Sequence, residues 1–297
     1  MLLPEFTYLS PGTLPEACSL LAQYGNEAAV LAGGTDLLVK MKERQLTPHY
    51  LIGLKNIDNL DFIKLDDNKR ISIGAMTTLN TIAVSPIIRR KLTFLALTAD
   101  NMANQQIRNM GTIGGNLCNA APSADTAPPL IASGANAVLT SPHKTRTIAL
   151  EEFFTAPGQT VRKADEVLGE IQIPVPPALW GGVYFKLSQR SKADIAAVGV
   201  AAAVTLSAEG KCTGCRIVLG AVAPTPLRAK RAEQFLLDKV ITNDLIAETS
   251  HLAAEDARPI SDVRSSAEYR QEMVAVLTRR ALAGALEEAR QHKDTSK

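Results

Sequence analysis

The chain has 297 residues, of which 46% are hydrophobic and 21% charged, and its formal net charge is +2. This length predicts two or three compact units, and the composition is that of a globular protein, neither disordered nor fibrous. The small net charge and the few aromatic residues exclude an electrostatic case for nucleic-acid binding. The start of the chain lacks the regions of a signal peptide, and the longest apolar run, 196–206, is too short to cross a bilayer. We therefore expect a cytoplasmic protein without a membrane anchor.

Helix signals open the first unit, which we place at residues 1–56. Thr13 and Glu16 have the spacing of a capping box, and Gly25 suits the position after a helix. The β–α–β order of the segments that follow favours a small parallel sheet. The expected elements are strands at 28–31 and 50–54, with an apolar segment at 37–41 between them.

The second unit, at residues 57–177, has a mixed pattern. Ser85 and Pro86 open a helix that we extend to residue 100, and 110–125 is predicted as a loop of small residues. Asp125 precedes two prolines and is a candidate N-cap of a further helix. The expected strands are 62–65 and 70–74, paired as a hairpin, then 137–140, 145–149 and 167–173.

The third unit, at residues 178–297, has strands at 183–187, 196–206 and 216–219, then helices from Ala229 that end in an amphipathic stretch at 268–291. The predicted fold class is α+β. It comprises a two-part unit, with one small parallel sheet and one mixed or antiparallel sheet, followed by an antiparallel sheet with a helical bundle.

Four cysteines in a chain of this length do not predict a disulfide scaffold. Cys212 and Cys215 have CxxC spacing, but no second pair and no nearby histidine completes a metal set. We interpret them as part of a turn before the strand at 216–219, with a redox or metal role as the alternative. No metal site is predicted.

Two segments place paired glycines beside a threonine and an Asx residue: 32–36 (AGGTD) and 112–116 (TIGGN). Glycine permits positive φ and has no Cβ, so successive N–H groups can turn inward around an anion. Neither segment contains Lys or Arg, which favours neutral donors. Two such segments from different units would clasp a diphosphate, although each alone is also typical of an ordinary tight turn.

Other nucleotide-binding motifs do not match. The sequence contains neither GxxxxGK[ST] nor GxGxxG. The segment 32–36 follows a strand, but no acidic residue at the required distance completes a dinucleotide-binding fingerprint.

LAGGTDLLVKMKE, together with IRNMGTIGGNLCNAAPSADTAPPLIASGA, resembles the FAD-binding subunit of the molybdenum hydroxylases. This family includes the medium chains of carbon monoxide and nicotinate dehydrogenases and the flavin domain of xanthine dehydrogenase. FKLSQRSKADIAAVGVAA resembles the start of the family's C-terminal domain, so the resemblance covers nearly the whole chain. It implies FAD as the cofactor.

The resemblance also implies the residues around FAD. Asp125 would accept a hydrogen bond from the cofactor, and Lys186 would stabilise the reduced flavin. The alternative for Lys186 is a position at a solvated strand end. The alternative for Leu168 is a position in the hydrophobic core. Arg190 and Asp194 match a segment that can gate access to the flavin; an exposed surface loop is the alternative for both. The implied cofactor-binding residues are Val30, Leu31, Ala32, Gly33, Gly34, Thr35, Asp36 and Leu37 on one side, Thr112, Gly114, Gly115 and Asn116 on the other, then Asn119 and Asp125, Met102 and Gln106 near the adenine, and Leu168 and Lys186 on later strands.

The resemblance further implies an oxidoreductase subunit that passes electrons from a partner's iron–sulfur clusters through FAD to NAD, oxygen or a quinone. Its four cysteines are too few to bind a pair of clusters with four ligands each. The implied partners are a large molybdopterin-binding subunit and a small subunit with two [2Fe–2S] clusters, assembled as a dimer of heterotrimers. We identify no acid–base pair or nucleophile in this chain. The alternative function is a non-catalytic nucleotide-binding protein or an assembly scaffold.

Overall fold

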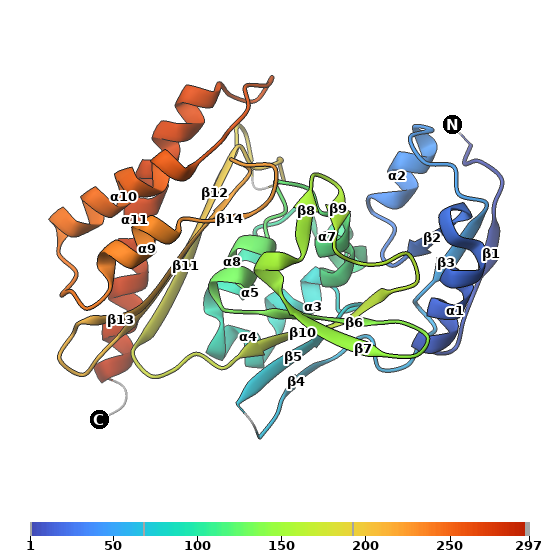
Figure 1. Cartoon of the computed structure of the whole chain (residues 1–297), viewed down its shortest axis with the longest axis horizontal. Coiled ribbons are helices and arrows are strands. Elements are labelled where there is room, and N and C mark those ends of the chain that lie inside the picture. The colour runs from blue at the N-terminus through green and yellow to red at the C-terminus, as the bar shows by residue number, and fades with distance from the viewer. Residues whose placement is uncertain (1, 68, 192, 295–297) are drawn as a thin grey trace.

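The chain folds into three successive parts, each built around its own β-sheet (Figure 1). The computed structural model describes residues 2–67, 69–191 and 193–294. Along the longest axis the blue N-terminal part, the teal-to-green middle part and the yellow-to-red C-terminal part follow one another. The predicted α+β class is confirmed. Within these residues no helix is both long enough and apolar enough to span a membrane.

The N-terminal sheet has three parallel strands in the order β1-β3-β2, which confirms the predicted parallel sheet. The helix before β2 begins as expected, because the Thr13 side chain accepts a hydrogen bond from the Glu16 N–H at 3.3 Å. Strand β1 was not predicted, since three residues are too short for an alternating pattern. The elements are β1 (Thr7–Leu9), α1 (Leu14–Tyr24), β2 (Ala28–Leu31), α2 (Leu37–Lys42) and β3 (Tyr50–Gly53).

The middle sheet is antiparallel, in the order β4-β5-β10-β6-β7, and the predicted hairpin is its β4–β5 pair. Its buried isoleucines pack against the helices of this part in one hydrophobic core. A two-stranded ribbon, β8–β9, lies beside it. The strands are β4 (Ile63–Leu65), β5 (Arg70–Gly74), β6 (Asn136–Thr140), β7 (Thr145–Ala149), β8 (Phe154–Ala156), β9 (Gln159–Thr160) and β10 (Val167–Pro174).

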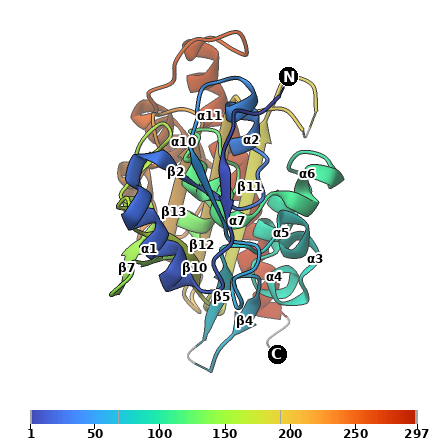
Figure 2. The same cartoon turned by 90° about the vertical axis from the view of Figure 1, so that its right-hand side faces the viewer.

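The helices of the middle part differ from the prediction. The expected helix at 85–100 is two helices, because the backbone leaves helical geometry at Leu92, with φ −141° and ψ 54°. Two further helices, α3 and α6, were not predicted, and in Figure 2 helices α3 to α6 gather on one side of the molecule, opposite α1. The helices are α3 (Leu79–Val84), α4 (Pro86–Lys91), α5 (Thr93–Asp100), α6 (Gln105–Met110), α7 (Ile113–Asn119) and α8 (Ala127–Ala132).

The predicted loop at 110–125 is also wrong in part, because it contains helix α7. Paired glycines disfavour a helix by about 1 kcal/mol each, which is why the sequence indicated a loop. Thr112 compensates as the N-cap: its hydroxyl accepts a hydrogen bond from the Gly115 N–H at 3.0 Å. The buried side chains of Ile113 and Leu117 pack into the hydrophobic core of the middle part, and this packing further stabilises α7.

The C-terminal sheet is antiparallel, in the order β11-β12-β13-β14. The predicted strand at 196–206 is β12, and it is buried on both faces: Ala201 and Ala203 pack into the middle core, and Val200 and Val204 pack towards the C-terminal helices. The elements are β11 (Trp180–Leu187), β12 (Val198–Leu206), β13 (Cys212–Gly220), β14 (Leu227–Arg228), α9 (Lys230–Leu236), α10 (Asn243–Asp256) and α11 (Ala267–Asp294).

Cys212 and Cys215 lie in strand β13, so their interpretation as a turn is wrong. A register shift opposite Thr205 and Leu206 inserts one extra residue, which places both cysteines on the same buried face although they are three residues apart. Both are free thiols. In the described part of the chain, no three His, Cys, Asp or Glu side chains are grouped so that they could hold a metal ion.

Close packing of β11 on α11 gives a stability prediction. A Cβ added to Gly181 would overlap the Ala285 carbonyl oxygen and lie 2.7 Å from the Glu288 Cβ, so Gly181→Ala must push the helix outwards. We expect the free energy of unfolding to fall by roughly 1–3 kcal/mol, measured by urea titration. Gly12→Ala is the control, because a Cβ at the exposed Gly12 meets only the Glu16 side chain, at 3.9 Å. Equal stability of the two variants would contradict the packing described here.

Candidate cofactor-binding cleft

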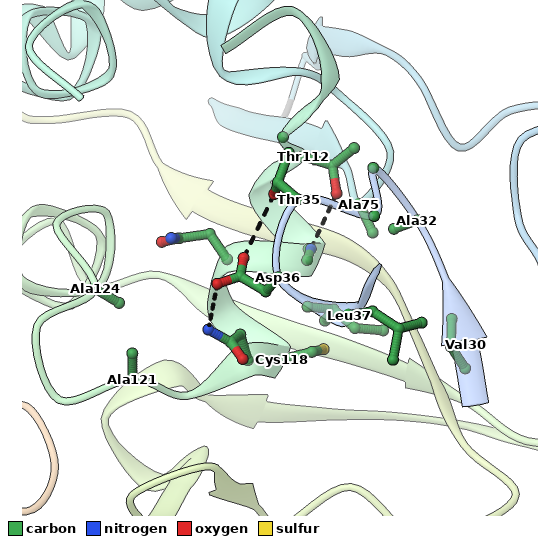
Figure 3. A pocket seen from close by; sticks show the side chains of 18 of the residues that line it. Val30, Ala32, Thr35, Asp36, Leu37, Ala75, Thr112, Cys118, Ala121 and Ala124 are labelled. Carbon is green, nitrogen blue, oxygen red and sulfur yellow. Dashed lines mark hydrogen bonds between the residues drawn. The ribbon is translucent and has the colours of Figure 1, made fainter. Parts of the chain in front are cut away.

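A cleft of about 670 Å³ runs between the N-terminal and middle parts and reaches strand β11 of the C-terminal part (Figure 3). This volume lies in the range of ligand and cofactor sites. Of the predicted site residues, Leu31 and Gln106 do not line the cleft: the Leu31 side chain packs beneath Gly34, and Gln106 is exposed on α6. The predicted residues that line it are Val30, Ala32, Gly33, Gly34, Thr35, Asp36, Leu37, Met102, Thr112, Gly114, Gly115, Asn116, Asn119, Asp125, Leu168 and Lys186.

The first wall is the turn between β2 and α2, at residues 33–37. Gly34 has φ +74°, a conformation that favours glycine and lets the backbone turn sharply at the end of the strand. Among the described residues, the backbone N–H groups of 33–37 have no hydrogen-bond acceptor. Five consecutive N–H groups are therefore available to a ligand in the cleft.

The second wall, helix α7, differs from the expectation that both glycine segments offer N–H groups. The Ile113 N–H donates to the Thr77 carbonyl at 3.0 Å, and the Gly114 N–H donates to the Ala75 carbonyl at 2.9 Å. The Gly115 N–H is taken by Thr112, whose hydroxyl can still donate its own proton into the cleft. This wall therefore contributes a close, flat surface and a hydroxyl group.

The glycines of α7 are required by close packing. A Cβ on Gly114 would lie 2.6 Å from the Ala75 Cβ, so no side chain fits there. A Cβ on Gly115 would lie 3.8 Å from the Ala32 Cβ, across the cleft. Gly115 and Ala32 therefore define the narrow part of the cleft.

Asp36 connects the two walls (Figure 3). Its carboxylate accepts a hydrogen bond from the Asn119 amide at 3.0 Å and one from the Thr35 hydroxyl at 3.4 Å. The Asn119 carbonyl oxygen in turn accepts from the Lys40 ammonium at 2.7 Å. Lys40 also lines the cleft and was not predicted, although its position four residues after Asp36 places the two on one face of α2.

At the far end of the cleft, Asp125 is buried and fixed by two donors from β11. The Tyr184 hydroxyl donates to one carboxylate oxygen and the Lys186 ammonium to the other, each at 2.7 Å. Burial raises the pKa of Asp125, against the lowering effect of Lys186, and burial together with Asp125 raises the pKa of Tyr184 well above its usual value. These contacts were not predicted. The available signal is that Tyr184 and Lys186 are two residues apart in a strand, which places both side chains on the same face of β11.

Two alternatives from the sequence are therefore wrong. Asp125 is not an N-cap, because α8 begins at Ala127 after Thr126 and has no side-chain cap. Lys186 is not at a solvated strand end, because its side chain is only 12% exposed.

Met102, Leu168, Arg190 and Asp194 remain from the prediction, and Cys118 lies in the same glycine-rich segment as α7. Met102 and Leu168 are buried and give the cleft apolar surface. Asp194 lines the cleft, whereas Arg190 points away with an 83% exposed side chain; the two form an ion pair at 3.0 Å. Cys118 packs against the middle core, and burial raises its pKa to about 11, so its thiol stays protonated at neutral pH.

Comparison with known proteins agrees with this geometry. Residues 4–176 match the FAD binding domain in molybdopterin dehydrogenase, and residues 183–285 match the CO dehydrogenase flavoprotein C-terminal domain. The chain belongs to the FAD-binding subunits of the molybdenum hydroxylases. It is 36% identical to the carbon monoxide dehydrogenase medium chain of Hydrogenophaga pseudoflava over 95% of this chain and 97% of that one. It is 32% identical to the putative xanthine dehydrogenase FAD-binding subunit of Escherichia coli K12 over 94% and 96%.

The fold agrees as well. A chain of the carbon monoxide dehydrogenase structure from Hydrogenophaga pseudoflava superposes with a TM-score of 0.93, covering 97% of this chain and 99% of that one at 36% identity. Membership of the family makes this chain a flavoprotein subunit of an oxidoreductase, with FAD as its cofactor.

The cleft fits FAD on several independent grounds. It combines unused N–H groups at residues 33–37, suited to a diphosphate, with a glycine wall that admits close approach. Its apolar surface at Met102 and Leu168 suits aromatic rings.

The buried ion pair at the end of the cleft gives a prediction. Lys186→Met leaves the Asp125 carboxylate buried without its cation, which we expect to cost roughly 3–5 kcal/mol of unfolding free energy near pH 8. The pKa of Asp125 is already raised in the folded protein, and losing Lys186 raises it further. The cost therefore disappears as Asp125 becomes protonated and grows as pH rises, so thermal melts near pH 5 should show a smaller loss.

A second substitution controls for lost packing. Asp125→Asn removes the unpaired charge, so the double variant should be more stable near pH 8 than Lys186→Met alone. A pH-independent loss that Asp125→Asn does not reduce would show that Lys186 stabilises the protein by packing only.

Proposed function

We propose that this chain carries FAD along the cleft and transfers electrons from iron–sulfur clusters of a partner subunit to an external acceptor. The observation that carries the proposal is the row of unused N–H groups at residues 33–37, facing the glycine wall of α7 across one cleft. The N–H groups would bind the diphosphate, together with the hydroxyl of Thr112. Met102 would lie towards the adenine, with Leu168 and Lys186 towards the flavin.

When bound, FAD supplies the redox chemistry, and this chain's residues bind, orient and shield it. Lys186 and Asp125 together add almost no net charge at the flavin end, while Tyr184 holds the carboxylate in place. The Cys118 thiol remains a packing group because its pKa is about 11. Asp194, on the rim, would shape access of the acceptor, which is NAD, oxygen or a quinone.

The proposed partners are a large molybdopterin-binding subunit and a small subunit with two [2Fe–2S] clusters, assembled as a dimer of heterotrimers. Support comes from the relatives named medium chain, a term that refers to complexes of several subunits. We place the complex in the cytoplasm, in keeping with four cysteines that are all free thiols.

We also propose that the chain divides at about residues 56 and 177 into two FAD-binding subdomains and a C-terminal domain. Its three larger sheets, each confined to one of these ranges, support this division. The cleft would then lie where all three meet.

The test of electron transfer uses the assembled complex. Removing FAD should abolish reduction of the external acceptor, while the organic substrate still bleaches the iron–sulfur absorbance. Acceptor reduction that survives complete flavin removal would overturn the proposed route. A scaffold or a non-catalytic nucleotide-binding protein would likewise leave turnover independent of FAD.

The location of FAD is tested by Gly115→Val. The added side chain would enter the narrow part of the cleft, opposite Ala32, and crowd Thr112, 2.9 Å from the new Cβ. We expect bound flavin to fall below about a tenth of the wild-type content, measured from the absorbance of the purified chain. Gly214→Val is the matched control, because Gly214 lies in β13 with its nearest neighbour at 3.5 Å. Full flavin content in Gly115→Val, with an unchanged circular dichroism spectrum, would place FAD elsewhere.

A further inference from the structure

The first cleft wall carries an acidic residue in an unexpected position. Asp36 precedes α2 at its N-cap, where an aspartate side chain usually accepts hydrogen bonds from the first N–H groups of the helix. Here the Asp36 side chain makes no such bond. Its carboxylate instead points across the cleft to Asn119, 83 residues further along the chain.

Lys40 determines how Asn119 can hold that carboxylate. A carboxamide has one accepting end and one donating end. Because the Lys40 ammonium occupies the oxygen end at 2.7 Å, the NH₂ end is turned towards Asp36 at 3.0 Å. Without the ammonium, the carboxylate still favours the NH₂ end of the amide, but the oxygen end loses the hydrogen bond that anchors Asn119 in this position.

The trio also joins the two walls. Lys40 and Asp36 belong to the segment of α2, whereas Asn119 is the last residue of α7. Among the described residues, the side-chain hydrogen bonds that connect 33–42 to α7 are those two bonds to Asn119. All three side chains line the cleft.

We propose that Lys40 is a positioning residue that, through Asn119, keeps the Asp36 carboxylate turned across the cleft and away from the first turn of α2, next to the N–H groups of residues 33–37. A released carboxylate would turn back over the first turn of α2, as an N-cap aspartate usually does, and place a negative charge beside the diphosphate. Lys40 therefore sets the affinity for FAD without touching it. This inference rests on the proposed location of FAD in the cleft.

The experiment measures the dissociation constant of FAD for the full-length apoprotein by fluorescence quenching, in wild type, Lys40→Met, Asn119→Ala and the double variant. Each single variant should weaken FAD binding about tenfold, the size expected for a lost hydrogen bond to a charged group. The double variant should be no weaker than either single one, because both changes release the same carboxylate. Lys40→Arg should retain most of the affinity.

Lys42→Met is the matched control. Lys42 lies on the same helix and its loss changes the net charge equally, but it is exposed and does not line the cleft, so FAD binding should be unchanged. Thermal melts of each apoprotein, compared with wild type, check that the fold is retained; Asn119→Ala tests the same trio if Lys40→Met is unstable.

Several outcomes would overturn the inference. Additive losses in the double variant, shrinking at high salt, would mean that Lys40 acts on the diphosphate directly. Unchanged affinity in Lys40→Met, or an equal loss in Lys42→Met, would also reject it. In these cases wild type still binds FAD, and Gly115→Val still does not. Failure of wild type to bind FAD at all would instead reject the proposed site.

Discussion

Backbone contact between the N-terminal and middle parts is the constraint on which the cleft depends. A Cβ on Gly33 would overlap the carbonyl oxygen of Met110, so the turn after β2 lies directly against the segment that leads into α7. Within the middle part, Gly114 packs closely against Ala75, where an added Cβ would lie 2.6 Å from the Ala75 Cβ. A side chain at Gly33 would force the two parts apart, and one at Gly114 would displace α7 from Ala75, so these glycines fix the position and width of the cleft.

Several charged groups of the cleft have a partner before any ligand enters. Lys186 is paired with Asp125, Glu166 with Arg146, and Lys40 is linked to Asp36 through Asn119. A buried charge without a partner is costly, so each of these groups is of limited use as a direct ligand. The two glycine segments, which contain no Lys or Arg, therefore offer a diphosphate neutral N–H and hydroxyl donors.

The sequence predicted those parts of the fold that depend on local signals. The cap at Thr13, the β4–β5 hairpin and the strand within 196–206 all follow from patterns of residues that lie close together in the sequence. Predictions failed where tertiary contacts decided the outcome. Helix α7 forms despite its two glycines because Thr112 caps it and the middle core buries one face. The extra residue opposite Thr205 and Leu206 hides Cys212 and Cys215 in a strand.

For the site as well, the sequence indicated the local features but not the contacts between distant residues. The glycine segments were recognisable because paired glycines indicate a sharp turn or a close approach of the backbone, whichever residue lies opposite. The partners of Asp36 and Asp125 were not, because a carboxylate in a sequence does not reveal which donor 80 or 60 residues away will meet it; here the separations are 83 for Asn119 and 61 for Lys186. Both carboxylates join parts of the chain that fold around separate sheets. A ligand that binds between those parts stabilises their arrangement in proportion to its affinity, so FAD retention and the joining of the cleft walls should be linked.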